Sequence, residues 1–191
     1  PSEPSKASSP SPSKPPTAAP SNPPSTRNYW LMKAEPNTRL ENGHDVKFSI
    51  DDLAARTSPE PWDGIRNHVA KNNLLAMRRG DLAFFYHSNC KVPGIVGIME
   101  VVREATPDES AWDSGSAYYD PKSGPEKRTW YLVHVEFRRK FREMVGLREL
   151  QEYKGRGEAL EGMQLLKQSR LSVSKVEEGE WEFIMGLAEG K

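Results

Sequence analysis

The placement of the aromatic residues is the feature that most limits how this chain can fold. All five Trp, six Tyr and six Phe lie between Asn28 and Lys191, which is enough aromatic surface for the core of one domain of ordinary size. Residues 1–27 instead hold nine of the 16 prolines and eight serines. Such a segment cannot bury enough apolar surface to offset the entropy lost on ordering. We therefore expect a disordered Pro/Ser-rich tail at 1–27, followed by a single domain at 28–191.

The charge distribution argues against binding that is driven mainly by unspecific attraction to phosphates. The chain has no net charge, and the tail carries Lys6, Lys14 and Arg27 against Glu3, so the domain has a charge of about −2 by count. Proteins that bind nucleic acid mainly through phosphate attraction are usually basic. The basic run "RRKFR" at 138–142 still allows one face to meet a nucleic-acid backbone.

Several other classes of protein are disfavoured by composition. Cys90 is the single cysteine, so no disulfide can form within the chain and a reducing compartment is expected. No run of about 18 apolar residues indicates a membrane span. The four His and one Cys lack the spacing of a zinc site, so we expect no metal and no cofactor. His87 near Cys90 is a poor sign of nucleophilic catalysis, because catalytic partners are usually distant in sequence.

The order of predicted elements indicates an α+β fold. Strands are expected at 28–34, 82–87 and 94–104, in the alternating stretch "TWYLVHVEF", and in "RLSVSKV" near the end. Helices are expected from Ser49, at 66–78, 146–152 and 158–168, and in the amphipathic C-terminal segment. A long polar loop is expected at 106–128. Strands and helices rarely alternate one for one, which favours a mostly antiparallel barrel of five or six strands with flanking helices.

Six motifs in order resemble those of the EVE-domain family, in the PUA-like superfamily. They are "YWLMKAEP", "WDGIRNHVAKN", "GDLAFFYHSNCKVPGIVGIMEVV", "PDESAWDSGSAYYDPKS", "RTWYLVHVEF" and "QSRLSVSKV", and they cover nearly all of 28–188. The resemblance implies a PUA-like pseudo-barrel with a pocket at its mouth, a nuclear location and a monomer. It implies a non-catalytic reader of a modified nucleobase, with 5-methylcytosine or its oxidised forms in DNA the first choice. Two alternatives remain open: a reader of modified RNA, or a small amide or nucleoside hydrolase using Lys33 and Glu35.

The residues and the resemblance together predict a base-binding site. Trp30 and Trp62 are candidates for stacking on a base, although core packing is an equally good explanation for either. Trp130 points away from the face of Tyr131 and Val133, which favours a pocket or its rim over packing under a helix. The full predicted base-binding set is Trp30, Lys33, Trp62, Tyr86, His87, Ser88, Asn89 and Trp130.

Two short segments carry the hydrogen-bonding part of this prediction. Ser88 and Asn89 follow a buried aromatic run and can satisfy the Watson–Crick edge of a base that has left its duplex. They are also common turn residues, so a turn before Pro93 is the alternative. Arg66 and Asn67 open a predicted helix, where backbone N–H groups favour an anion. We therefore expect phosphate contacts from Arg66, Asn67 and Arg170. The tail segment "SPSPSKPP" favours a polyproline II helix for a partner domain.

Overall fold

The computed structural model describes residues 27–191, so the predicted tail lies outside the described residues except for Arg27. A six-stranded sheet forms the centre of the molecule, in the order β4-β7-β6-β5-β1-β8. Its strands are β1 (Tyr29–Ala34), β4 (Glu60–Pro61), β5 (Leu82–His87), β6 (Gly94–Pro107), β7 (Tyr131–Gly146) and β8 (Val173–Val176). Only β1 and β5 pair in parallel, and the other four neighbouring pairs are antiparallel.

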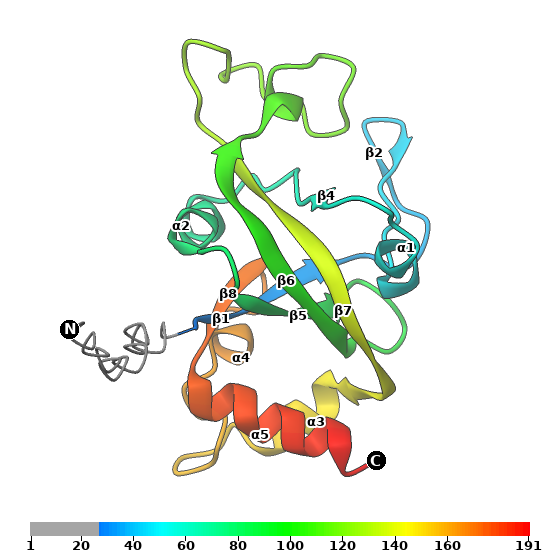
Figure 1. Ribbon diagram of the computed structural model, residues 1–191, viewed down its shortest axis with the longest axis vertical. Coiled ribbons are helices and arrows are strands. Elements are labelled where there is room, and N and C mark those ends of the chain that lie inside the picture. The colour runs from blue at the N-terminus through cyan, green and yellow to red at the C-terminus, as the bar shows by residue number, and fades with distance from the viewer. Residues whose placement is uncertain (1–26) are drawn as a thin grey trace, which may run out of the picture.

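Within residues 27–191, five α-helices flank this sheet. They are α1 (Ile50–Ala54), α2 (His68–Ala76), α3 (Leu147–Glu152), α4 (Gln164–Lys167) and α5 (Glu178–Glu189). Figure 1 shows α3, α4 and α5 gathered at one end of the sheet, with α1 and α2 on either side of its middle. The predicted α+β class with a mostly antiparallel sheet and flanking helices is therefore confirmed. The sheet is not a closed barrel, because β4 and β8 remain its two edges.

The alternation of side chains in the central strands separates two hydrophobic clusters. Trp30 and Met32 of β1 and Phe85 of β5 pack with α1 and α2 in the first cluster. Leu31 and Phe84, from the same strands, point to the opposite face and pack against α5 in the second cluster. Successive residues of a strand point to opposite faces, so a short aromatic run such as Phe84–Phe85 serves both clusters.

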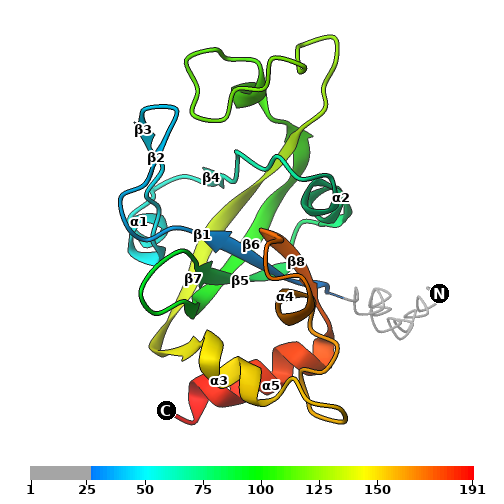
Figure 2. The same cartoon turned by 180° about the vertical axis from the view of Figure 1, so that it is seen from behind.

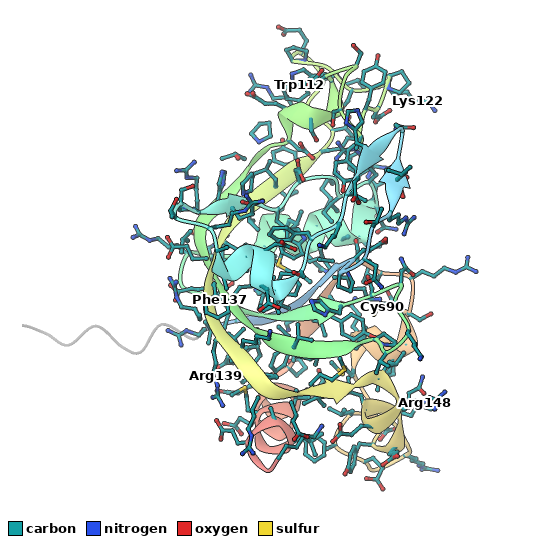
Figure 3. All side chains as sticks on the ribbon, turned by 90° about the vertical axis from the view of Figure 1, so that its right-hand side faces the viewer. Cys90, Trp112, Lys122, Phe137, Arg139 and Arg148 are labelled. Atoms are coloured by element: carbon teal, nitrogen blue, oxygen red, sulfur yellow. The ribbon has the colours of Figure 1, made fainter. Side chains whose placement is uncertain are left out.

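The long strands β6 and β7 carry the most irregular part of the chain between them. Residues 108–130, here called the excursion, leave the end of β6 and return at the start of β7, and they contain the short 3-10 helix η1 (Glu109–Ala111). Figure 2 shows this segment beyond one end of the sheet, on the side away from α3 and α5. Trp112 and Lys122 mark it in Figure 3, far from Arg148 on α3. The predicted polar loop is thus confirmed.

One small element was not predicted, and one predicted helix is shorter than expected. The stretch 37–47 forms a small hairpin of β2 (Leu40–Glu41) and β3 (His44–Asp45), with Asn42 and Gly43 at positive φ in its turn. The helix expected at 158–168 is limited to Gln164–Lys167. Residues 158–162 form bends and turns instead, and Gly162 among them is a poor helix former.

Candidate functional site

Side chains of varied chemistry surround a cavity of about 490 Å³, here called the central cavity. It lies between the end of β1, the segment before α1, the loop after β4 and the excursion. Its volume is in the range of small-ligand sites. Three aromatic residues line it, and they come from three separate parts of the chain: Phe48, Trp62 and Tyr118.

Trp62 is fixed in this wall by contacts on its inner side. It is 6% exposed, and its ring meets those of Phe48 and Phe85 edge to face, with centroids 6.1 and 5.5 Å away. Its backbone N–H donates to the carbonyl of Val133 on β7 at 2.8 Å. The indole is therefore held in one orientation by the core while it lines the cavity, as a rigid stacking surface requires.

Tyr118 lies directly over the backbone of Gly64. A side chain at Gly64 would place its Cβ 2.7 Å from the Tyr118 ring, and Gly64 also has φ +76°. Only glycine combines this backbone with so close an approach. Burial, with added repulsion from Asp63, Glu41 and Glu35, raises the pKa of Tyr118 to about 12, so the ring keeps its hydroxyl proton.

Arg66 connects Tyr118 to the rest of the fold. Its Nη1 lies 2.7 Å from the Asp108 carboxylate, its Nε donates to the Tyr118 carbonyl at 2.8 Å, and its Nη2 donates to Ser110 Oγ at 3.1 Å. Asp108 is completely buried and also accepts from the Gly64 N–H at 3.0 Å. The guanidinium predicted to bind a phosphate is instead occupied in holding the excursion over the cavity.

Asn67 also has a structural role. Its Oδ1 accepts from the backbone N–H groups of Val69 and Ala70 at 2.9 and 3.0 Å, which caps α2. The side chain thus fills the position where an anion was expected to meet the start of this helix. Neither Arg66 nor Asn67 lines the central cavity.

A second cavity of about 550 Å³ adjoins the first and is here called the Lys33–Arg170 cavity. Lys33, Glu35 and Ser172 line both cavities. Most of the remaining predicted residues are found here: Tyr86, Ser88, Asn89 and Arg170. The structure therefore divides the predicted site, with Trp62 in one cavity, these four residues in the other, and Lys33 between them.

Lys33 is tethered at this junction. Its Nζ donates to the carbonyl of Ser169 at 2.7 Å and lies 5.7 Å from the centre of the Tyr86 ring. Burial lowers the pKa of Lys33 and raises that of Tyr86 to about 12. Arg170 is exposed and forms no ion pair with another residue of 27–191, so its charge is available to a ligand.

Ser88 and Asn89 form the turn that the sequence left as an alternative. Asn89 has φ +50°, and its Nδ2 donates to Glu35 at 2.7 Å. Ser88 donates from both N–H and Oγ to the Ala34 carbonyl, at 2.8 and 3.2 Å. They line the cavity while holding the β5–β6 connection against the end of β1.

Three predicted residues lie elsewhere. Trp30 is 3% exposed in the first hydrophobic cluster, and its indole N–H donates to Asp81 at 2.9 Å. Trp130 packs against His68 at the start of α2, with ring centroids 4.9 Å apart, and donates to Asp120 at 2.7 Å. His87 accepts from the Ile50 N–H at the start of α1 at 3.2 Å through Nε2. The structure brings none of the three to either cavity, because each has a partner within the fold.

The contact of His87 predicts a pH effect on stability. Burial lowers its pKa from 6.5, and the acceptor role of Nε2 requires the neutral ring. Its contribution is therefore complete above pH 6.5 and is lost as the pH falls from 6.5 towards the lower folded pKa. We expect the free energy of unfolding of wild type, measured relative to that of His87→Gln, to decrease between pH 7 and pH 5, because the glutamine amide oxygen still accepts at every pH. Denaturant unfolding at each pH measures this. An equal slope in both proteins would contradict it.

The basic run at 138–142 is not a free track for phosphates. Arg138 pairs with Glu100 and Glu136, Arg139 with Glu189, and Lys140 with Asp51. Neighbouring strands and helices thus neutralise three of its four charges.

Phe48, Asp63 and Tyr118 line the central cavity but were not predicted from the sequence. Asp63 was missed because Asp63-Gly64 is typical of a turn, and Tyr118 was missed because it belongs to a polar loop without periodicity. Of these three residues, Phe48 has a local sequence signal that fixes its position, because it directly precedes Ser49, the residue that caps α1. In 27–191, no group of three or more His, Cys, Asp or Glu side chains is placed to hold a metal ion, and no helix there is long and apolar enough to cross a bilayer.

Comparison with known proteins identifies relatives over almost the whole described region. Thymocyte nuclear protein 1 of mouse is 47% identical over 167 residues, which are 85% of this chain and 74% of that protein. The human THYN1 protein, solved in complex with DNA containing 5-methylcytosine, is 43% identical with a TM-score of 0.83, over 86% of this chain and 99% of that one. A solved structure from Leishmania major is 43% identical with a TM-score of 0.76, over 86% and 96% of the two chains. The EVE domain profile matches residues 28–187, and the chain therefore belongs to the EVE-domain family.

Proposed function

We propose that this chain is a non-catalytic reader that binds a modified base of nucleic acid, foremost 5-methylcytosine or its oxidised forms in DNA, in the central cavity. The observation that carries the proposal is the cavity itself, which has three aromatic walls from three segments and a rigid Trp62. The human relative solved with DNA containing 5-methylcytosine supports this choice of ligand. We further propose that 28–191 acts as one EVE domain in a nuclear protein, in line with the names of its vertebrate relatives.

The aromatic walls suit a flat base that has left its duplex. Stacking on an aromatic ring contributes about 1–3 kcal/mol per base, whatever the base. A methyl group adds a comparable amount, because one methylene in a tight pocket contributes about 1–3 kcal/mol. We therefore expect a preference for 5-methylcytosine over cytosine of about 10- to 200-fold.

The side chains that could support catalysis are held by other parts of the fold. The Cys90 thiol lies against the Val92 carbonyl at 3.4 Å, and His87 already accepts from Ile50. Glu35, a candidate for hydrolysis with Lys33, is held by Arg39 and Asn89. Among Cys90, His87, Glu35 and Lys33, no nucleophile therefore lies next to a free base.

Binding to matched oligonucleotides tests this proposal. The oligonucleotides carry one cytosine, 5-methylcytosine or oxidised 5-methylcytosine in otherwise identical DNA and RNA. Reversible binding with a preference for modified DNA is expected, with the ligand recovered intact. A preference for modified RNA would indicate the RNA reader instead, and loss of the modified nucleoside over time would indicate a hydrolase.

Arg170 is proposed to contact a phosphate beside the bound base, because it is exposed at the neighbouring cavity and has no ion-pair partner among the described residues. We expect Arg170→Ala to reduce the slope of log K against log salt by about 0.9, the contribution of one phosphate contact in duplex DNA. The ratio of affinities for modified and unmodified cytosine should not change. Arg156→Ala, which alters a cation outside both cavities, is the matched control. A changed ratio with an unchanged slope would show that Arg170 contacts the base.

A further inference from the structure

Asp63 differs from every other acidic residue around the central cavity. Five carboxylates line it, and four have partners: Glu35 and Glu41 pair with Arg39, Glu60 pairs with Arg56, and Asp45 accepts from two backbone N–H groups. Asp63 forms no ion pair or hydrogen bond with another residue of 27–191. The nearest cation, Arg66, is already held by Asp108. The Asp63 carboxyl is therefore the acid whose hydrogen-bonding capacity remains for a ligand.

The surroundings of Asp63 favour its protonated form. It lies in sequence between Trp62 and Gly64, over which the Tyr118 ring is placed. The residue as a whole is exposed to solvent, but partial burial of its carboxyl beside the cavity, with repulsion from Asp108, raises its pKa to about 6. Arg66 and the Asp63 backbone N–H oppose this shift, and Glu60 adds to it.

Asp63 also faces a third cavity, of about 760 Å³, under the excursion. The titratable and charged groups that line this side are Arg103, Asp108, Glu109, Arg128 and His134. Those that line the central cavity, besides the acids named above, are Lys33, Arg39, His44, Lys47, Arg56 and Tyr118. The charges around Asp63 are thus mixed in sign, and none of the cations forms an ion pair with it.

We propose that Asp63 reads the amino edge of the cytosine ring in the central cavity, with one carboxyl oxygen accepting from the 4-amino group and the other sharing a proton with ring N3. The inference rests on the proposed function and names the group that recognises the base there. A cytosine that leaves its duplex exposes an amino donor next to the N3 acceptor, and both lose their partners. A neutral carboxyl offers one donor and one acceptor, whereas an ionised carboxylate offers acceptors alone.

The proton balance of this contact can be measured. Above pH 6, free Asp63 is ionised and free cytosine is neutral, so the complex takes up one proton from solution. Whether that proton rests on the carboxyl oxygen or on N3 does not change the balance. The aromatic walls contribute no such dependence, because their rings do not titrate in this range.

The first test compares the pH dependence of binding in wild type and Asp63→Asn. An asparagine amide donates to N3 and accepts from the 4-amino group without a proton. We expect the wild-type dissociation constant for a duplex with one 5-methylcytosine to be constant below pH 6 and to rise about tenfold per pH unit above it. That of Asp63→Asn should stay flat up to pH 8. A pH dependence that persists in Asp63→Asn would assign it to another group, such as His44, and overturn the inference.

The second test removes the amino group from the base. A 5-methylpyrimidin-2-one base keeps the methyl, the ring and N3, but has hydrogen in place of the 4-amino group. We expect wild type to bind it at least tenfold more weakly than 5-methylcytosine, because a buried acceptor is left unpaired. In Asp63→Ala the difference should shrink to about twofold. Equal losses in both proteins would overturn the inference and leave the reader function intact.

The two proposals fail in different ways. Because the Asp63 carboxyl bonds no other described residue and its charge is disfavoured in the fold, both substitutions should leave the melting temperature at or above the wild-type value. The isosteric Asp63→Asn decides the question if Asp63→Ala does not fold. Wild-type protein that fails to distinguish 5-methylcytosine from cytosine at any pH would overturn both proposals. A clear preference with flat pH dependence in wild type would overturn the Asp63 inference alone.

Discussion

Arg66→Ala is expected to lower the free energy of unfolding by about 3–5 kcal/mol, because removing one partner of a buried ion pair leaves an uncompensated charge. That charge is Asp108, which is fully buried and pairs with an Arg66 side chain that is 22% exposed. The Tyr118 carbonyl and Ser110 lose their donors in the same substitution. Equilibrium unfolding in urea measures the loss.

The same variant should also lose affinity for the base. Arg66 holds the Tyr118 carbonyl and Asp108 holds the Gly64 N–H, so loss of the pair releases the excursion and removes one wall of the central cavity. In the double variant Arg66→Met/Asp108→Asn, much of the stability should return, because no buried charge remains unpaired. If Arg66 contacts a phosphate instead, Arg66→Ala will reduce the salt slope by about 0.9 and leave the unfolding curve unchanged. That result would contradict the structural role.

The parts of the fold that were predictable depend on local signals. Ser49 and Asp52 form the capping box that the sequence indicated at the start of α1. β1 ends at Ala34, before Pro36, and the aromatic run of β5 is a buried strand as expected. Capping, proline placement and β-branched or aromatic runs act over a few residues, so one sequence is sufficient to recognise them.

The extent of β7 shows where local signals mislead. The alternating stretch "TWYLVHVEF" predicted a strand that ended near Phe137, but β7 continues to Gly146 through the basic run. Charged residues at 138–140 are tolerated there because they are exposed and form ion pairs with acidic residues on β6, α1 and α5. Those acids are distant in sequence, so the pattern within the run could not reveal them.

The candidate site was only partly predictable for the same reason. Trp30 is joined to Asp81, 51 positions away, and Arg66 to Asp108, 42 positions away. Without knowledge of those partners, an indole or a guanidinium beside a motif is equally consistent with a structural contact and with a ligand contact. Trp62 and Lys33, both predicted to bind the base, line the central cavity, whereas Tyr118 reaches it only because the excursion folds back over Gly64.

Trp30 and Trp62 provide a matched pair that separates core packing from base binding. Both are nearly buried, at 3% and 6% exposure, and both belong to the first hydrophobic cluster. We expect Trp30→Ala to lower the free energy of unfolding by about 3–5 kcal/mol, the usual cost of truncating a buried tryptophan to alanine. The loss includes one of the hydrogen bonds to Asp81, which is 3% exposed. Protein that remains folded at low temperature should bind 5-methylcytosine with wild-type affinity.

Trp62→Ala is expected to affect both properties, because this indole packs on Phe48 and Phe85 and also lines the central cavity. Removing one stacking surface should weaken binding by about 1–3 kcal/mol, or roughly 5- to 150-fold. Trp62→Phe keeps an aromatic ring in the core and should recover more of the stability than of the affinity. Thermal unfolding and titration of the same preparations separate the two effects. Of the two indoles, Trp62 lines the central cavity and Trp30 does not. If folded Trp30→Ala loses affinity while Trp62→Ala keeps it, the base therefore binds outside the central cavity.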